Sequence, residues 1–198
     1  MSKYPLASRS WDHRELEAIQ TVIDQNMFTM GKCVADYEKC FADFFVSKYA
    51  VMVSSGSAAN LLMISSLFYT RNEAHKLKRG DEVIVPAVSW STTYFPLQQY
   101  GLKVKFVDID PDTLNINLIE LENAITDKTR AILAVNLLGN PNDFGAIKKL
   151  VAGRNIILLE DNCESMGAMI DHKLTGTFGI MGTFSSFFSH HISTMEGG

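Results

Sequence analysis

The sequence has few cysteines, and none of them is paired by pattern. Only three cysteines occur among the 198 residues, and no CxxC arrangement is present. An odd number of such cysteines argues against a disulfide framework and is typical of the reducing cytoplasm, where we expect this protein to reside. No apolar run reaches the ~18 residues that a membrane-spanning helix needs. The segment Met1 to Pro5 also lacks the apolar core of a signal peptide.

The sequence also lacks an excess of positive charge. Its 18 Lys and Arg residues are outnumbered by 22 Asp and Glu residues, which gives a net charge of -4. This balance weighs against nucleic acid or an anionic membrane as the main partner. There is no internal repeat and no low-complexity segment. The hydrophobic fraction of 46% is enough for a packed core in one domain or two small ones.

Short apolar runs alternate with helical patterns along the chain. The expected strands are residues 49–53, 83–85, 104–107, 131–135 and 156–159. The expected helices follow Asp12, which with Glu15 forms a capping-box pattern, and then cover residues 34–45, 59–67, 93–100, 118–125 and 143–150. Strands that are apolar on both faces and alternate with helices predict an α/β fold with a mostly parallel sheet covered on both faces.

Three apolar segments end in small or ionisable residues. Residues 49–53 lead into Ser54 to Asn60, and residues 156–159 lead into Glu160 to Glu164. The last stretch, from Ser185 to Gly198, reads as the end of a buried strand, a polar turn with two histidines and a tight glycine corner. Strand ends of a parallel sheet gather along one edge, so we expect a ligand site there.

Taken by themselves, the candidate residues allow more than one interpretation. Gly56 and Ser57 open a helix after an apolar segment, which suits a phosphate, although a serine-capped turn is the simpler reading. They have neither the P-loop lysine nor the dinucleotide-binding spacing of glycines. Trp90 follows a strand and could stack on a planar cofactor or belong to the core.

The ionisable candidate residues also allow more than one interpretation. Asp161 ends an apolar strand, so its carboxylate must be paired or face a cleft, as a helix N-cap, an ion-pair partner or a ligand group. Glu164 alone reads as a solvated residue at a helix start. His190 and His191 are adjacent, and adjacent residues of a strand point to opposite faces. No cysteine or third histidine has ligand spacing to them, so we expect no metal.

Together, the three segments resemble the sugar aminotransferases that use pyridoxal phosphate (PLP), which have the aspartate-aminotransferase fold. In that family the third segment resembles Ser-Phe-Tyr-Gly-Asn-Lys followed by Gly-Glu-Gly-Gly, and the lysine forms a Schiff base with PLP. A gap-free alignment from Gly179 to Gly198 places His190, and not His191, at the lysine position. A histidine there is typical of the small dehydratase branch of the family. The resemblance runs through the chain from Tyr4.

The resemblance implies a PLP site built from several segments. The matching Gly56 and Ser57 would hold the phosphate, with a hydroxyl from Ser185. Trp90 would lie over the pyridine ring, and Asp161 would pair with the protonated ring nitrogen.

Two further residues lie at the reacting side of this expected site. Glu164 would lie near the ring hydroxyl or the reacting face. His190 would act as the catalytic base, because histidine cannot replace the Schiff-base lysine but can still remove a proton.

The implied reaction is the 3-dehydration of a nucleotide-linked 4-keto-6-deoxyhexose by pyridoxamine phosphate, with glutamate restoring the amine form. The resemblance favours GDP-4-keto-6-deoxymannose as substrate, in the biosynthesis of O-antigen dideoxysugars. One alternative is a CDP-linked glucose 3-dehydrase in which Cys163 begins an iron–sulfur ligand set. A sugar aminotransferase and a non-catalytic fragment are the others.

Family members are longer than this chain. We therefore expect residues 1–198 to comprise an N-terminal segment plus most of the PLP-binding large domain, without the small C-terminal domain. The family also implies a homodimer. The helix around Leu61, Leu62 and Met63 and the aromatic N-terminal segment are the expected surfaces for it.

Overall fold

A computed structural model of the chain describes Tyr4, Ala7 and residues 10–198. Most of the stretch from Tyr4 to Ser8, where the family resemblance begins, lies outside these residues. The chain divides into two compact units, Met1–Met52 and Val53–Gly198. Among the described residues, no helix has the length and apolar character required to cross a lipid bilayer.

The first unit contains two helices. Helix α1 (His13–Gln25) begins at Asp12, whose side chain accepts the Arg14 N–H, while Glu15 bonds back to the Asp12 backbone at 2.7 Å. The predicted capping box is therefore confirmed. Helix α2 (Lys32–Phe44) follows Gly31. Its end is covered by aromatic side chains, since the rings of Phe41 and Phe45 stack with centroids 4.5 Å apart.

The predicted strand over residues 49–53 is wrong. A strand needs a neighbouring extended segment to complete its hydrogen bonds. Within the described part of the chain, only Val53 of these residues exchanges backbone bonds with such a segment: it donates to the Gly198 carbonyl at 2.8 Å and accepts from the Gly198 N–H at 3.1 Å. A single hydrogen-bonded pair of residues does not form a β-strand.

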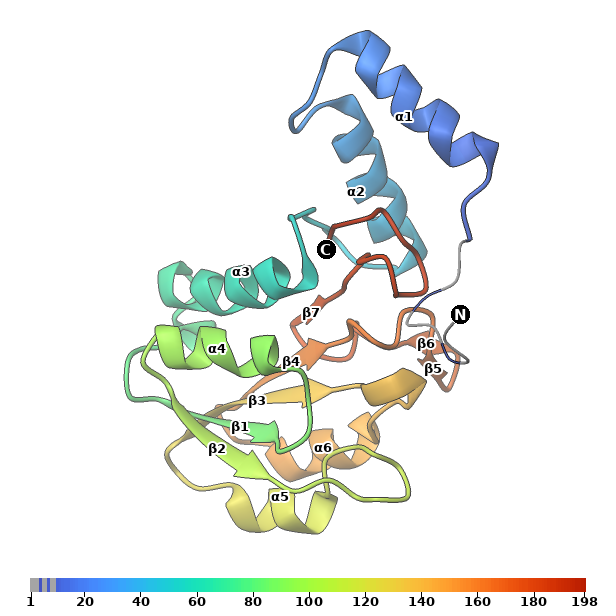
Figure 1. The fold of residues 1–198 in the computed structure, drawn as a ribbon. Coiled ribbons are helices and arrows are strands. Elements are labelled where there is room, and N and C mark those ends of the chain that lie inside the picture. The colour runs from blue at the N-terminus through green and yellow to red at the C-terminus, as the bar shows by residue number, and fades with distance from the viewer. Residues whose placement is uncertain (1–3, 5–6, 8–9) are drawn as a thin grey trace. The chain divides into compact units, whose positions relative to one another are not determined.

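The second unit is a parallel sheet between two layers of helices (Figure 1). Its five strands lie in the order β2-β1-β3-β4-β7. They are β1 (Glu82–Pro86), β2 (Lys103–Val107), β3 (Thr129–Val135), β4 (Ile157–Asp161) and β7 (Met181–Thr183). Helices α3 (Gly56–Tyr69) and α4 (Ser91–Gln99) cover one face, and α5 (Leu118–Ala124) and α6 (Phe144–Val151) cover the other. The predicted α/β fold is confirmed.

Smaller elements connect these layers. They are η1 (Glu73–His75), η2 (Leu137–Gly139) and a hairpin of β5 (Met169–Ile170) with β6 (Lys173–Leu174). Strand β7 ends at Thr183, so the prediction that Ser185 ends a buried strand is wrong. The chain leaves the sheet there, because the Ser186 N–H turns to the Gly197 carbonyl at 2.9 Å.

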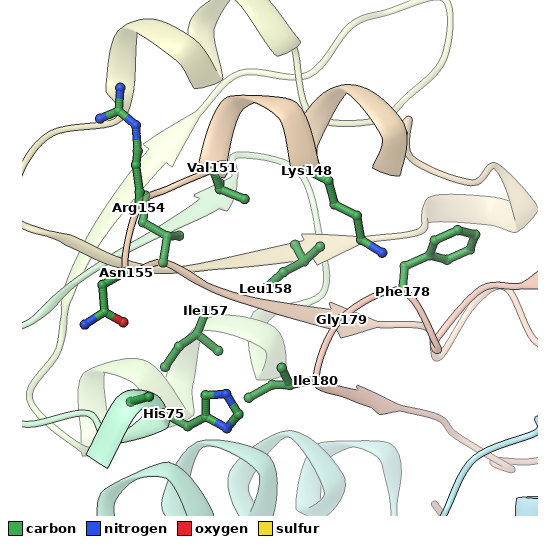
Figure 2. A pocket seen from close by; sticks show the side chains of 12 residues that line it. His75, Lys148, Val151, Arg154, Asn155, Ile157, Leu158, Phe178, Gly179 and Ile180 are labelled. Carbon is green, nitrogen blue, oxygen red and sulfur yellow. The ribbon is translucent and has the colours of Figure 1, made fainter. Parts of the chain in front are cut away.

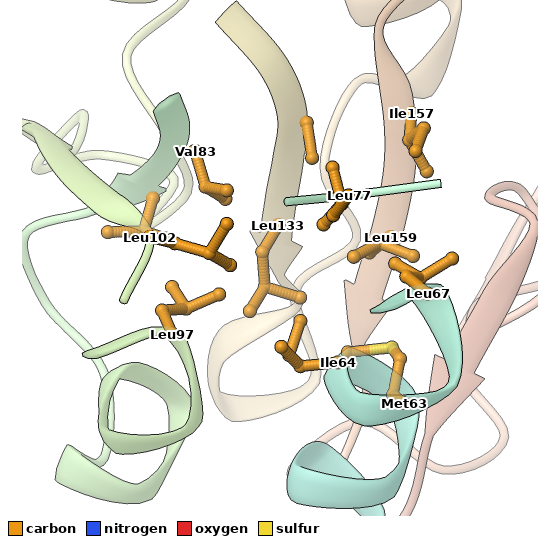
Figure 3. Close-up of a cluster of buried hydrophobic side chains, with 12 residues drawn as sticks. Met63, Ile64, Leu67, Leu77, Val83, Leu97, Leu102, Leu133, Ile157 and Leu159 are labelled. Carbon is orange, nitrogen blue, oxygen red and sulfur yellow. The ribbon is translucent and has the colours of Figure 1, made fainter. Parts of the chain in front are cut away.

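A hydrophobic core fixes α3 against the sheet (Figure 3). Ile64 and Leu67 of α3 meet Leu133 of β3, and all three are nearly inaccessible to solvent. Burying each such side chain contributes about 1.5–3 kcal/mol. Met63 also lies in this core, with 4% of its surface exposed, and so does not belong to the expected dimer surface, whereas Leu61 and Leu62 are exposed.

Candidate active site

Asp161 is the last residue of β4 and the centre of the candidate site. Only 5% of its surface is exposed. Its Oδ2 accepts the Asn60 Nδ2 amide at 2.9 Å and the Thr93 hydroxyl at 2.8 Å, while Oδ1 accepts the Cys163 N–H at 3.2 Å. No cationic side chain in the described part of the chain forms an ion pair with it, and no helix begins after it. The N-cap and ion-pair readings therefore both fail.

The start of α3 packs against the end of the chain. The helix N-cap is Ser55, whose hydroxyl accepts the Ala58 N–H at 3.1 Å. Ser57 does not serve as the cap, and this residue is exposed. Gly56 is buried, and a Cβ built on it would lie 2.7 Å from the Ser185 Cβ and 2.8 Å from the Cys163 sulfur. Only glycine fits this position. Because glycine has no side chain, Ser185 can approach the start of α3.

Trp90 lies at the N-cap position of α4, directly after β1 and its loop. Its side chain is 70% exposed, so the alternative of a core tryptophan is wrong. A large apolar ring held at the carboxyl side of a strand can stack on a planar ligand.

The two histidines lie in a turn between Ser186 and Gly197. This loop is closed at its base, where the Thr194 N–H donates to the Ser186 carbonyl at 2.9 Å and the two hydroxyls lie 2.7 Å apart. His190 is half-buried and His191 is exposed. Since neither belongs to a strand, the expectation that they point to opposite sheet faces is wrong. Among the described residues, no three His, Cys, Asp or Glu side chains group to hold a metal.

The electrostatics of the site centre on His190. Burial lowers the pKa of His190 below its ordinary 6.5, Glu164 and Asp161 oppose this, and the neighbouring His191 adds to it. Glu164 does not start a helix, as predicted for it alone, but lies in a turn and accepts the Leu138 N–H at 3.1 Å. Glu164 and Asp161 therefore both lie close enough to the half-buried imidazole to act on its pKa.

Cys163 follows Asp161 by two residues and packs against the start of α3. Burial raises the pKa of the Cys163 thiol well above its usual value, and the nearby Asp161 adds to the effect. The side chain thus has a packing role at this position, beside the Gly56 backbone.

Sequence reasoning missed three polar residues of the site. Asn60 (2% exposed), Thr93 (1%) and Thr183 (4%) are buried around Asp161. Asn60 carried a signal, since it is a polar residue within the apolar run of α3, one turn after Gly56. A buried amide needs a partner, and that requirement could have indicated a role.

A separate cavity lies at the opposite end of β4 (Figure 2). It has a volume of about 320 Å³ and is bordered by Lys148, Arg154, Ile157, Phe178 and Ile180, among others. Ile157 is the first residue of β4 and Asp161 the last. The cavity therefore belongs to the amino end of the strands and takes no part in the candidate site.

Comparison with known proteins agrees with this geometry. The model of the DegT/DnrJ/EryC1/StrS aminotransferase family matches residues 9–198. The chain belongs to this family. The family resemblance seen in the sequence is thereby confirmed.

Several members of the family are close to the chain. It is 70% identical over 198 residues to a GDP-4-keto-6-deoxy-D-mannose 3-dehydratase of Yersinia pseudotuberculosis, covering all of this chain and 50% of that protein. A crystal structure of GDP-4-keto-6-deoxymannose-3-dehydratase with a trapped PLP-glutamate geminal diamine is 67% identical, with a TM-score of 0.95 over 98% of this chain and 50% of that one.

A third relative is a variant of the protein called ColD, in which a histidine is replaced by lysine and the serine directly before it by asparagine. It is 66% identical, with a TM-score of 0.93 over 96% of this chain and 49% of that one. The chain thus spans about half the length of the relatives that it matches.

Proposed function

We propose that the protein uses pyridoxamine phosphate to remove the 3-hydroxyl of GDP-4-keto-6-deoxymannose, with glutamate restoring the amine cofactor, in deoxysugar biosynthesis for O-antigen. The observation that carries this proposal is His190, a half-buried base that stands at the family's lysine position with Asp161 and Glu164 nearby. The names of the close relatives support the substrate and the cofactor.

The residues of the site fit PLP. The N–H groups at the start of α3, with the Ser57 and Ser185 hydroxyls, suit its phosphate. The exposed ring of Trp90 suits its planar ring. Asp161 is a buried carboxylate with no cationic partner among the described residues, so a protonated pyridine nitrogen would supply the charge that it lacks. When bound, the cofactor supplies an amino group that joins the 4-keto carbon and a ring that accepts electrons.

His190 has the properties of a general base. Because burial lowers the pKa of His190, its imidazole is unprotonated at neutral pH and can take a proton from the cofactor's aminomethyl carbon. A histidine cannot hold the cofactor covalently as lysine does, so binding depends on the phosphate, ring and nitrogen contacts. Glu164 stabilises the protonated imidazole after the transfer.

Two observations favour His190 over His191. His190 is half-buried at the site, whereas His191 is exposed. The ColD variant alters a histidine that directly follows a serine, and the one Ser-His pair in this sequence is Ser189-His190. We therefore assign the proton transfer to His190.

The quaternary structure and the extent of the domain are part of the same proposal. We propose that residues 1–198 form the N-terminal segment and most of the PLP-binding large domain. We also propose a homodimer that buries the exposed Leu61 and Leu62 of α3, and a cytoplasmic location, which the unpaired cysteines support.

One experiment tests the base and the substrate together. GDP- and CDP-linked 4-keto-6-deoxysugars are assayed side by side with PLP and glutamate, using wild type, His190→Asn and the matched control His191→Asn. We expect the GDP sugar to react faster and His190→Asn to lose at least ~100-fold in rate, the usual contribution of a positioned base. PLP binding should persist in both variants. A preference for the CDP sugar, or an active His190→Asn with an inactive His191→Asn, would contradict the proposal.

A further inference from the structure

Asn60 connects helix α3 to two strands through the two ends of one buried amide. Its Nδ2 donates to Asp161 Oδ2 on β4 at 2.9 Å, and its Oδ1 accepts the Thr183 hydroxyl on β7 at 2.7 Å. The side chain is 2% exposed and its helix is otherwise apolar on this face, with Met63 and Ile64 next to it. A buried amide in such a place is costly unless both ends are bonded, and here both are.

The direction of these bonds follows from the carboxylate oxygen of Asp161, which accepts the Asn60 amide. An ionised carboxylate can only accept hydrogen bonds, so Asn60 must turn its NH₂ group toward Asp161. Its carbonyl oxygen then faces Thr183, whose hydroxyl must donate. Thr183 therefore holds the amide in the orientation that presents its NH₂ group to Asp161.

The two carboxylate oxygens of Asp161 accept different hydrogen bonds. Oδ2 accepts from both Asn60 and Thr93, while Oδ1 accepts the Cys163 N–H. Rotating the carboxylate would break two bonds at Oδ2.

We propose that Asn60 is a positioning residue, which holds the Asp161 carboxylate in the orientation that pairs with the cofactor's ring nitrogen. This role rests on the proposed function, because it assumes that Asp161 meets that nitrogen. Asn60 itself bonds to Asp161 and Thr183 and needs no contact with the sugar.

The test uses the holoenzyme loaded with PLP that carries ¹⁵N in its ring. Asn60→Leu keeps the volume and removes both hydrogen bonds, and Thr183 keeps an acceptor in the Glu160 carbonyl, 3.3 Å away. We expect the ring ¹⁵N resonance to move toward that of unprotonated pyridine. The kcat should fall by roughly 10- to 150-fold, the effect of losing one hydrogen bond to a charged group, with the KM for the nucleotide sugar unchanged.

A matched control is Ser65→Ala in the same helix, since the Ser65 hydroxyl bonds to the Leu62 carbonyl of its own turn, at 3.0 Å, and to no other group in the described part of the chain. This control should leave the ring resonance and kcat at wild-type values. A merely structural loss in Asn60→Leu would lower the melting temperature without moving the ¹⁵N resonance, and that result would overturn the inference. If Asn60→Leu does not fold, Thr183→Val decides by the same resonance, which should move in the same direction.

A third variant separates this inference from the proposed function. If Asp161→Asn leaves the ring resonance unchanged, Asp161 is not the partner of the ring nitrogen and the proposed function loses that contact. If Asp161→Asn moves the resonance and Asn60→Leu does not, only the role of Asn60 is refuted.

Discussion

Replacing Glu160 by glutamine tests how β4 holds the loop that leads into β7. Glu160 is completely buried. Its Oε1 accepts the backbone N–H groups of Phe178 at 2.5 Å and Gly179 at 2.7 Å, and its Oε2 accepts that of Gly176 at 2.6 Å and the Asn136 amide at 3.3 Å. One carboxylate thus satisfies three backbone donors of the loop that precedes β7.

Glutamine has nearly the same shape but only one acceptor oxygen. In the best orientation its oxygen replaces Oε1, and its NH₂ group then faces the N–H of Gly176. A buried donor that loses its acceptor costs about 1–3 kcal/mol. Burying a neutral amide costs less than burying a charge, which offsets part of this loss. We expect Glu160→Gln to lower the free energy of unfolding by about 1–3 kcal/mol near neutral pH.

The pH dependence of this loss has a defined sign. Burial raises the pKa of Glu160 above its ordinary 4.5, against the opposing effect of the backbone N–H groups. The folded protein therefore holds this proton more tightly than the unfolded chain, and the stabilisation is full below pH 4.5 and declines as pH rises through the raised pKa. Glutamine does not titrate, so the difference between wild type and variant should shrink over that pH range.

Urea unfolding of wild type, Glu160→Gln and Glu122→Gln, measured below pH 4.5 and near neutrality, checks both statements. Glu122 is an exposed glutamate of α5 and serves as the control. A change under about 0.5 kcal/mol in Glu160→Gln, the usual size for a surface substitution, would refute the reasoning. A difference that grows with pH would show that the sign of the pKa shift is wrong.

Four other predictions concern the site and the assembly. Asp161→Asn should nearly abolish turnover in a folded protein, because an amide does not keep the ring nitrogen protonated; a kcat near wild type would contradict this. Because His190 must be unprotonated to act, the rate should fall as pH drops through its lowered pKa, and Glu164→Gln should move this limb to lower pH, since Glu164 raises that pKa; an unmoved limb would argue against their proximity. Borohydride should not attach PLP covalently to the wild type but should do so in His190→Lys; labelling of a lysine in the wild-type site would show that the base is misassigned. Light scattering under assay conditions should give a homodimer, and a fully active monomer would disprove it.

Local patterns were sufficient for most of the fold. The capping box at Asp12 and the apolar strands within β1, β2, β3 and β4 depend on neighbours in the sequence, so they could be read from it. The failures occur where a segment depends on a distant partner. Residues 49–53 have strand composition, but only Val53 finds a backbone partner, at Gly198. Similarly, β7 ends at Thr183 because Ser186 bonds to Gly197 and Thr194, across the turn that carries His190.

The sequence by itself made Gly56 and Asp161 candidates, because an apolar segment that ends in a glycine turn or an ionisable residue is visible locally. The family resemblance singled out His190 and suggested the role of each residue. The tertiary structure alone showed that His190 is half-buried while His191 is exposed. It alone revealed which groups form hydrogen bonds with Asp161 and with the loop before β7. The bond from Asn60 to Asp161 spans 101 positions, and the bond from Thr183 to Asn60 spans 123. Folding brings such pairs together across helix and sheet, and no local pattern encodes them.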